Sequence, residues 1–219
     1  MHTMLNHKLA AIGVRLAGIP AESPAPDLEA TLLDASSTAC HDGRLESIEF
    51  SWIHVHAAHV LVEKLQKQLR HADPVTRLMW SALAACAVKQ GQHKWRKVIE
   101  VPTRPVQLFP GNVEASALSL KGPEPWLAEY HILVPAGRLR IRESDILTIE
   151  ELARMNRQYR NRLLYGASWR ADIITAIEEG AATASAIVRQ TGCSYEPAHR
   201  IRKEYLIATQ AGLMTAAVP

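Results

Sequence analysis

The chain has 219 residues, which is enough for one large domain or two small ones. Hydrophobic residues make up 47% of it and charged residues 21%, as is typical of a soluble globular protein. The net charge of +3 permits nucleic-acid binding without requiring it, because a strong electrostatic footprint would be more one-sided.

No stretch approaches the roughly 18 apolar residues of a membrane span, and the first ten residues lack the apolar segment of a signal peptide. The three cysteines, Cys40, Cys86 and Cys193, are far apart and form no C-x-x-C pair. This usage is typical of reduced, buried thiols. We therefore expect a cytoplasmic protein that has no membrane partner.

Residues 1–100 form the first predicted domain, in which 19–27 is a proline-containing loop and 27–100 show the helical spacing of apolar residues almost throughout. Helices are predicted over 4–17 and over 45–69, the second with a kink or break. Asp73 and Pro74 suit the N-cap and first position of a further helix. Several helices with short breaks predict a helical bundle, which would serve dimerisation or bind a protein partner.

Residues 101–144 differ, since six of the twelve prolines fall between positions 101 and 135 without a helical period. We interpret this region as a connector between two domains. Within it, residues 132–134 and 139–141 flank a proline and a glycine, which predicts a small β-hairpin. Alternation along the second strand would place three arginines on one face, namely Arg138, Arg140 and Arg142.

Thr148 and Glu151 form a capping-box pattern that opens a helix predicted over 148–159. Five arginines and no acidic residue then lie between 154 and 170, the densest patch of one charge sign in the chain. Guanidinium groups suit phosphate oxygens, whereas the alternative is a solubilising helix that pairs with neighbouring glutamates. The arginines of this patch are Arg154, Arg157, Arg160, Arg162 and Arg170.

The stretch from Trp169 to Gly212 predicts three helices with short connections. Gly180 would end the first helix, and Thr183 would cap a short second one. Gly192 would then supply the positive φ of a tight turn, after which a longer helix begins near Ser194.

This last helix would bury three residues, Ala198, Ile201 and Tyr205, and leave a polar, basic face on its other side. A short helix, a glycine turn and a longer helix with such a face form the helix-turn-helix pattern. The segment resembles the helix-turn-helix of winged-helix transcriptional regulators of the broad ArsR/MarR-like kind. The positions that carry this resemblance are Ile187, Val188, Gly192, Cys193, Ala198 and Ile201.

The resemblance covers about a fifth of the chain and implies a winged-helix-like domain over residues 145–219, with room for one wing strand over 213–218. The expected fold class is therefore mainly α: a helical bundle, a connector with a β-hairpin, and a helix-turn-helix domain. The resemblance further implies a homodimeric regulator that binds double-stranded DNA in a sequence-specific way.

The helix over 195–207 would enter the major groove, where Arg200 can donate two hydrogen bonds to a guanine. The groove-facing residues would be Ser194, Tyr195, Glu196, His199, Arg200 and Lys203. The phosphate-contacting residues would be Arg157, Arg160, Arg162 and Arg170.

Two other functions remain open. The C-terminal module could bind another protein, as a helical adaptor or an antitoxin-like partner. A metal-dependent enzyme could use His54, His56 and His59, although no carboxylate or cysteine nearby completes a ligand set. No P-loop, dinucleotide-binding, hydrolase or kinase motif is present, so we expect no enzyme, no metal and no cofactor.

Overall fold

The chain is mainly helical, as its sequence predicts. A computed structural model describes residues 2–21, 25–39 and 42–213. The chain divides into two compact units, Met1–Leu152 and Ala153–Pro219, which we call the N-terminal and C-terminal units. Over the described ranges, no helix has both the length and the apolar character needed to cross a membrane.

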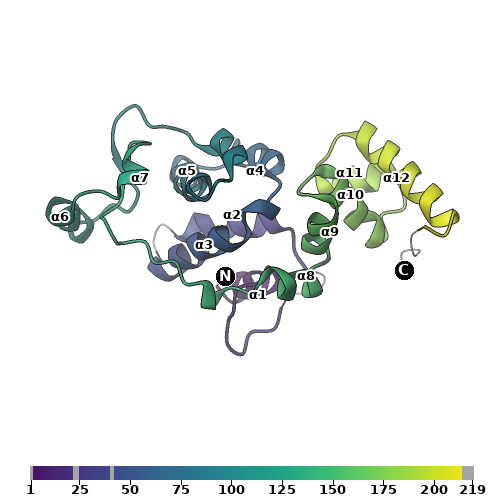
Figure 1. Cartoon of the computed structure of the whole chain (residues 1–219), viewed down its shortest axis with the longest axis horizontal. Coiled ribbons are helices and arrows are strands. Elements are labelled where there is room, and N and C mark those ends of the chain that lie inside the picture. Colours follow the sequence, from purple (N-terminus) through teal and green to yellow (C-terminus); the bar gives the residue numbers. More distant parts are fainter. Residues whose placement is uncertain (1, 22–24, 40–41, 214–219) are drawn as a thin grey trace. The chain divides into compact units, whose positions relative to one another are not determined.

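The N-terminal unit contains most of the elements (Figure 1). In chain order they are α1 (His2–Ala11), α2 (Leu28–Ala39), α3 (Gly43–His56), η1 (Ala57–His59), α4 (Val62–Leu69), α5 (Pro74–Lys89), η2 (His93–Val98), β1 (Val106–Gln107), α6 (Asn112–Lys121), α7 (Pro125–Ala128), β2 (Ile132–Leu133) and η3 (Glu143–Asp145). Helix α8 (Ile149–Met155) begins in this unit and ends in the C-terminal unit.

Helices α2, α3 and α5 pack against one another to form the centre of the N-terminal unit (Figure 1). Three tryptophans, Trp52, Trp80 and Trp95, are fully buried there. The rings of Trp80 and Trp95 stack with their centroids 6.3 Å apart. The indole N–H of Trp52 donates to the Ile12 carbonyl at 2.7 Å, which satisfies a polar group inside the core.

Local sequence signals set several helix boundaries in this unit. The Asp73 side chain accepts from the backbone N–H groups of Val75 and Thr76, and Pro74 occupies the first turn of α5. The helical pattern over 45–69 is interrupted by η1 and the extended Val60, so the predicted break is confirmed. Cys86 is buried and unpaired as predicted, whereas Cys40 lies outside the described residues.

The predicted β-hairpin is wrong. Strand β2 pairs in parallel with β1, with Val106 opposite Ile132. Residues 138–142 lie along α3 instead, where the Ser47 hydroxyl donates to the Arg140 carbonyl at 2.6 Å. The Ser51 hydroxyl also accepts from the Arg142 N–H, at 2.9 Å. These bonds engage backbone groups that a hairpin would have paired, and an alternating sequence pattern does not reveal such distant partners.

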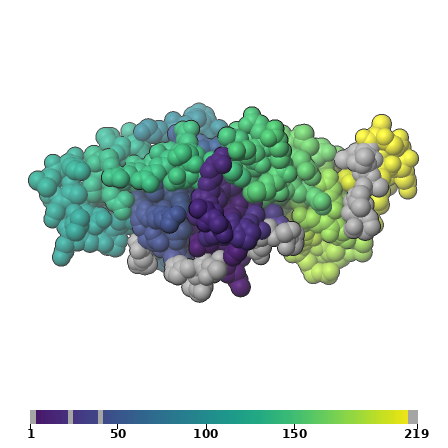
Figure 2. Space-filling view, turned by 90° about the horizontal axis from the view of Figure 1, so that it is seen from below, coloured from purple at the N-terminus to yellow at the C-terminus, as the bar shows by residue number. Residues whose placement is uncertain are grey.

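The region expected to be a connector is folded into the N-terminal unit. Leu108, Leu127, Ile132 and Val134 are all buried there. Figure 2 shows residues from the N-terminal segment (purple), from α3 (dark blue) and from the stretch after β2 (green) side by side on one face. Helix α6 is the exception, since it buries none of its residues and lies at the outer end of the unit (Figure 1).

The C-terminal unit contains the end of α8 and four further helices: α9 (Arg157–Tyr165), α10 (Trp169–Glu178), α11 (Ala184–Thr191) and α12 (Tyr195–Gln210). The predicted capping box is present, since Thr148 and Glu151 exchange two backbone-to-side-chain hydrogen bonds. The helix does not continue to residue 159, because the Asn156 side chain accepts from the Tyr159 N–H and caps α9. Of the expected wing strand, only Leu213 lies within the described residues.

Candidate nucleic-acid interface

Helices α11 and α12 are joined by the short turn that the sequence predicts. Thr183 caps α11 by accepting from the Ala186 N–H at 3.1 Å. Gly192 follows α11 in the left-handed region, with φ of 76°, where other residues are strained. Cys193, which is buried, then donates its N–H to the Thr191 hydroxyl at 3.2 Å. These contacts fix the corner between the two helices.

A hydrophobic cluster holds the two helices against α10, which contacts both of them. From α12 the cluster takes Ala198, Ile201 and Tyr205, the residues that the sequence predicts to be buried. Val188 packs against the cluster and is partly buried. Because one side of α12 is committed to this core, its opposite side is presented to solvent.

The six predicted groove-facing residues all lie on this solvent-exposed side, which we call the outer face of α12: Ser194, Tyr195, Glu196, His199, Arg200 and Lys203. The rings of Tyr195 and His199 stack with their centroids 6.1 Å apart. Hydroxyl, imidazole, guanidinium and ammonium groups can donate hydrogen bonds to base edges or phosphates.

Arg200 is held by two carboxylates one helical turn away on either side. Its Nε lies 3.4 Å from Glu196, and its Nη1 lies 3.0 Å from Glu204. Glu204 also binds Arg170 at 2.7 Å, and the hydrogen bond from Arg170 lowers the pKa of the Glu204 carboxyl. All these side chains are substantially exposed, so each pair contributes little to stability. Arg202 and Lys203 make no ion pair within the described part of the chain.

The four predicted phosphate-contacting arginines have different surroundings. Arg157, Arg160 and Arg170 are exposed. Arg157 donates to the Glu178 carbonyl at 2.8 Å, whereas Arg160 has no ion-pair partner among the described residues. Arg162 is only 1% exposed, so its prediction as a phosphate contact is wrong.

Arg162 binds Asp172 inside the unit, through Nε to one carboxylate oxygen at 2.8 Å and Nη2 to the other at 2.9 Å. Gln158 donates a further hydrogen bond to the Asp172 carboxylate. The high density of arginines in this part of the sequence therefore led to a wrong prediction for Arg162, which has a structural role. The available signal was Asp172 itself, an acid within the apolar run that forms α10.

Charge is distributed unevenly between the two units. Residues 153–219 contain nine lysines and arginines against five acidic residues, whereas residues 1–152 contain sixteen against seventeen. The whole excess of positive charge thus belongs to the C-terminal unit. A cationic unit attracts a polyanion such as duplex DNA.

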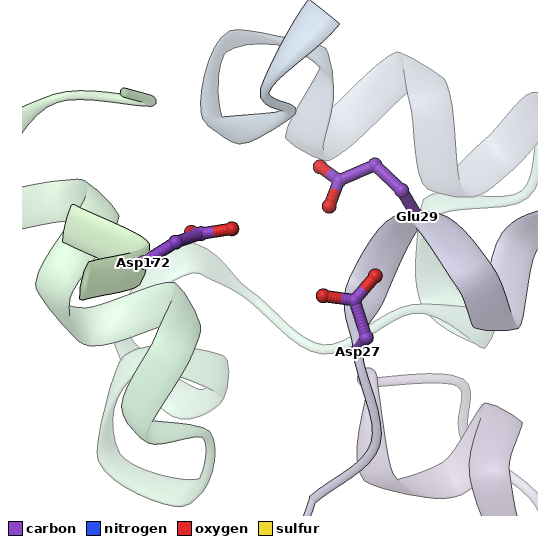
Figure 3. A group of neighbouring side chains, drawn as sticks. All are labelled: Asp27, Glu29 and Asp172. Carbon is purple, nitrogen blue, oxygen red and sulfur yellow. The ribbon is translucent and has the colours of Figure 1, made fainter. Parts of the chain in front are cut away.

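A group of carboxylates and a group of histidines have the residue types of metal ligands, but several of these side chains bind other residues of the protein. Figure 3 shows Asp27 and Glu29 at the start of α2, and the Lys64 ammonium forms ion pairs with both of them. Asp172, also labelled there, is the partner of Arg162 described above.

Of the three histidines considered as metal ligands, His54 and His56 bind other groups of the protein. The Nε2 atom of His54 lies 3.1 Å from Oε1 of Glu143, and its Nδ1 lies 2.7 Å from Nε2 of Gln90. The buried His56 ring lies 3.0 Å from the Leu147 carbonyl, and burial lowers its pKa to about 4. These contacts account for both rings as parts of the N-terminal unit's packing.

Comparison of the chain with family models, with curated proteins and with solved structures found no match. The geometry of α11, the Gly192 turn and α12 is therefore the main basis for a functional assignment.

Proposed function

We propose that this protein binds double-stranded DNA with sequence preference, as a transcriptional regulator, by inserting α12 into the major groove. The observation that carries the proposal is the corner at Gly192, which joins two helices packed on a common core and leaves the outer face of α12 exposed. The positive charge of residues 153–219 supports the same assignment.

In this proposal Arg200 reads a guanine, since its guanidinium can donate to both O6 and N7. It must first leave Glu196 and Glu204, which costs little because the pairs are exposed. Lys203 and His199 contact neighbouring bases, while Ser194 and Tyr195 lie close to the backbone at the start of the helix. Arg157, Arg160 and Arg170 contact phosphates.

The test begins with selection of bound sequences from a random duplex pool by the full-length chain. Affinity for the selected duplex is then measured by fluorescence anisotropy at about 50 and 200 mM salt. Arg200→Ala is expected to lose about 1–3 kcal/mol of preference for the selected sequence. Lys203→Ala tests a second residue of the outer face.

Arg70→Ala is the matched control, because it removes an exposed positive charge from the N-terminal unit. It should leave both the affinity and the sequence preference close to those of the wild type. Absence of any salt-dependent affinity for duplex DNA in the wild type would refute the proposal.

We also propose a homodimer, as in the regulators that the motif resembles, with the N-terminal unit available for dimerisation or a protein partner. A dimer bound to DNA requires two half-sites, so the selected sequences should be palindromic. Light scattering of the purified chain gives the number of copies independently. A monomer that selects a single asymmetric site contradicts this part of the proposal.

A second candidate function is binding of another protein through the same helix. Leu206 and Ile207, in the C-terminal half of α12, are 41% and 57% exposed, and apolar residues at such positions suit a protein interface. Co-purification of a stoichiometric partner whose binding is lost in Ile207→Asp, together with no affinity for DNA, would favour this function.

A further inference from the structure

A large cavity lies within the N-terminal unit, remote in sequence from the outer face of α12. Its volume is about 710 Å³, within the range of roughly 300–1,000 Å³ usual for small-molecule sites. Four segments form its walls: the residues after α1, the start of α3, the end of α6 and the stretch 135–145. Three of these segments are the ones that lie side by side in Figure 2. We call it the basic cavity.

The lining of the basic cavity carries six cationic side chains and one acid, Asp145. Two of the cations are neutralised nearby, since Arg15 binds Glu151 and Arg138 binds Glu46. The other four make no ion pair within the described ranges, and they are Arg44, Lys121, Arg140 and Arg142. Four uncompensated charges drawn from three segments of the chain converge on one concavity, which favours an anionic occupant.

The arginines after β2 belong to a fixed wall of this cavity. Arg138 donates to the buried Glu46 at 3.1 Å, and its guanidinium lies over the Phe109 ring. The backbone of Arg140 and Arg142 is bound to two serines of α3, as described above. A wall anchored at three points along five residues has a fixed backbone before a ligand arrives, and such preorganisation strengthens binding.

Apart from Ser47, the remainder of the lining consists of apolar side chains and glycines. Leu16 and Ala117 are partly exposed in this lining, whereas Val14, Ile48 and Pro135 are almost fully buried. Arginine and lysine suit phosphate oxygens, whereas the apolar surface suits an uncharged organic group.

We propose that the basic cavity binds a small organic molecule that bears two or more phosphate groups and is about the size of a nucleotide. The phosphates bind Lys121, Arg140 and Arg142, and the organic part lies against Leu16 and Ala117. The volume matches one such molecule. This site is independent of the proposed DNA interface, because every residue that lines it belongs to the N-terminal unit.

The experiment titrates the full-length chain with three probes, ATP, inorganic pyrophosphate and adenosine, in an isothermal calorimeter at low salt and without divalent cations. ATP and pyrophosphate are expected to bind, ATP more tightly, and adenosine is expected not to bind measurably. Arg140→Ala and Lys121→Ala should each weaken ATP about tenfold or more, the usual effect of losing one hydrogen bond to a charged group.

Arg104→Ala is the matched control, since Arg104 is exposed in the same unit and does not line the cavity. Its affinity for ATP should stay within about twofold of the wild type. Circular dichroism confirms that each variant is folded. Because the titration contains no DNA, its result is separate from the test of the proposed function.

Three outcomes would overturn the proposal. One is no binding of ATP, and another is equal loss of affinity in Arg104→Ala and Arg140→Ala. The third is a single-stranded oligonucleotide that displaces ATP, binds more tightly and loses affinity in the same variants. That result would make the site a groove for a nucleic-acid strand.

Discussion

Arg162 and Asp172 lie ten residues apart and meet out of contact with solvent. Withdrawing two charges from water is costly, and here each charge offsets part of that cost for the other. Gln158 and the neighbouring Asn161, which donates to Thr175 at 3.0 Å, complete a polar network between α9 and α10. At the scale of single residues, this network joins α9 to the helices that carry the candidate interface.

We predict that Asp172→Ala lowers the free energy of unfolding by about 3–5 kcal/mol, because the buried Arg162 would lose the carboxylate that accepts two of its hydrogen bonds. Urea denaturation followed by circular dichroism measures the change. The double variant Arg162→Met/Asp172→Leu should recover most of the loss, since both members of this buried pair are then apolar. The control Arg160→Ala should change the stability by less than about 0.5 kcal/mol. If Asp172→Ala and Arg160→Ala lowered the free energy of unfolding by similar amounts, the role assigned to the Arg162–Asp172 pair would be contradicted.

Glu49 is a different case, a buried carboxyl without an arginine. The Ser36 hydroxyl donates to it at 2.6 Å, and burial raises its pKa to about 8. In the unfolded chain the pKa is near its ordinary value of 4.5, so folding takes up a proton between these two pH values. The contribution of Glu49 to stability is therefore intact below pH 4.5 and declines as the pH rises towards 8.

Replacing Glu49 with glutamine, which stays neutral, should remove this decline. Relative to the wild type, Glu49→Gln is expected to gain at most about 1.4 kcal/mol for each pH unit between 5 and 8. Urea denaturation at pH 5, 6.5 and 8 gives the difference directly. Parallel stability profiles for the two proteins would show that Glu49 is ionised at neutral pH in the folded state.

At the scale of elements, the corner at Gly192 decides how α12 is presented. A Cβ at this position would meet no atom within 4 Å, so only the backbone conformation, φ of 76°, opposes substitution. Gly192→Ala should therefore cost about 1–2 kcal/mol, and Gly192→Asn less, because asparagine tolerates this region better. Thermal denaturation compares the two variants. An alanine variant as stable as the wild type would mean that the turn can adopt another conformation.

Local features of the fold could be predicted from the sequence because their partners are near in the chain. Asp73, Thr183 and Gly192 each act on residues within about four positions, and the buried side of α12 follows from helical periodicity. The failures involve distant partners. The parallel pairing of Val106 with Ile132, and the bonds from α3 to Arg140 and Arg142, link residues between 26 and 93 positions apart.

In the candidate interface, too, the features that depend on nearby residues could be predicted and those that depend on distant packing could not. The exposure of Arg200 and Lys203 could be inferred from the helix itself, whereas the burial of Arg162 depends on how α9 packs on α10. The basic cavity was not predicted at all. Arg138, Arg140 and Arg142 were expected to share a strand face, but nothing local indicates that Arg44 and Lys121 join them.

At the scale of the whole molecule, the boundary between Leu152 and Ala153 separates two units that differ both in their hydrophobic cores and in their net charge. The hydrophobic cluster around α10, α11 and α12 draws all its members from residues 169–205, and the positive excess lies in 153–219. Each unit therefore has its own core and its own electrostatic character. The proposed DNA binding and the proposed binding of an organic phosphate are assigned to different units for this reason.

Residues 153–219 produced alone are expected to unfold cooperatively on heating, because their core is self-contained. The fragment should also keep the salt dependence of duplex binding shown by the full chain, since it retains all the proposed phosphate contacts. Calorimetry and anisotropy are the two measurements. A gradual, non-cooperative transition would indicate that the C-terminal unit depends on the rest of the chain for its fold.

Helix α6 offers a built-in reporter. Since none of its ten residues is buried, only its own backbone bonds protect its amides, and they should take up deuterium much faster than those of α5. Ala117 and Lys121 of α6 nevertheless line the basic cavity. An occupied cavity would therefore slow isotope uptake in a peptide covering 112–121 and leave one covering 74–89 unchanged, so mass spectrometry could detect the ligand without a label.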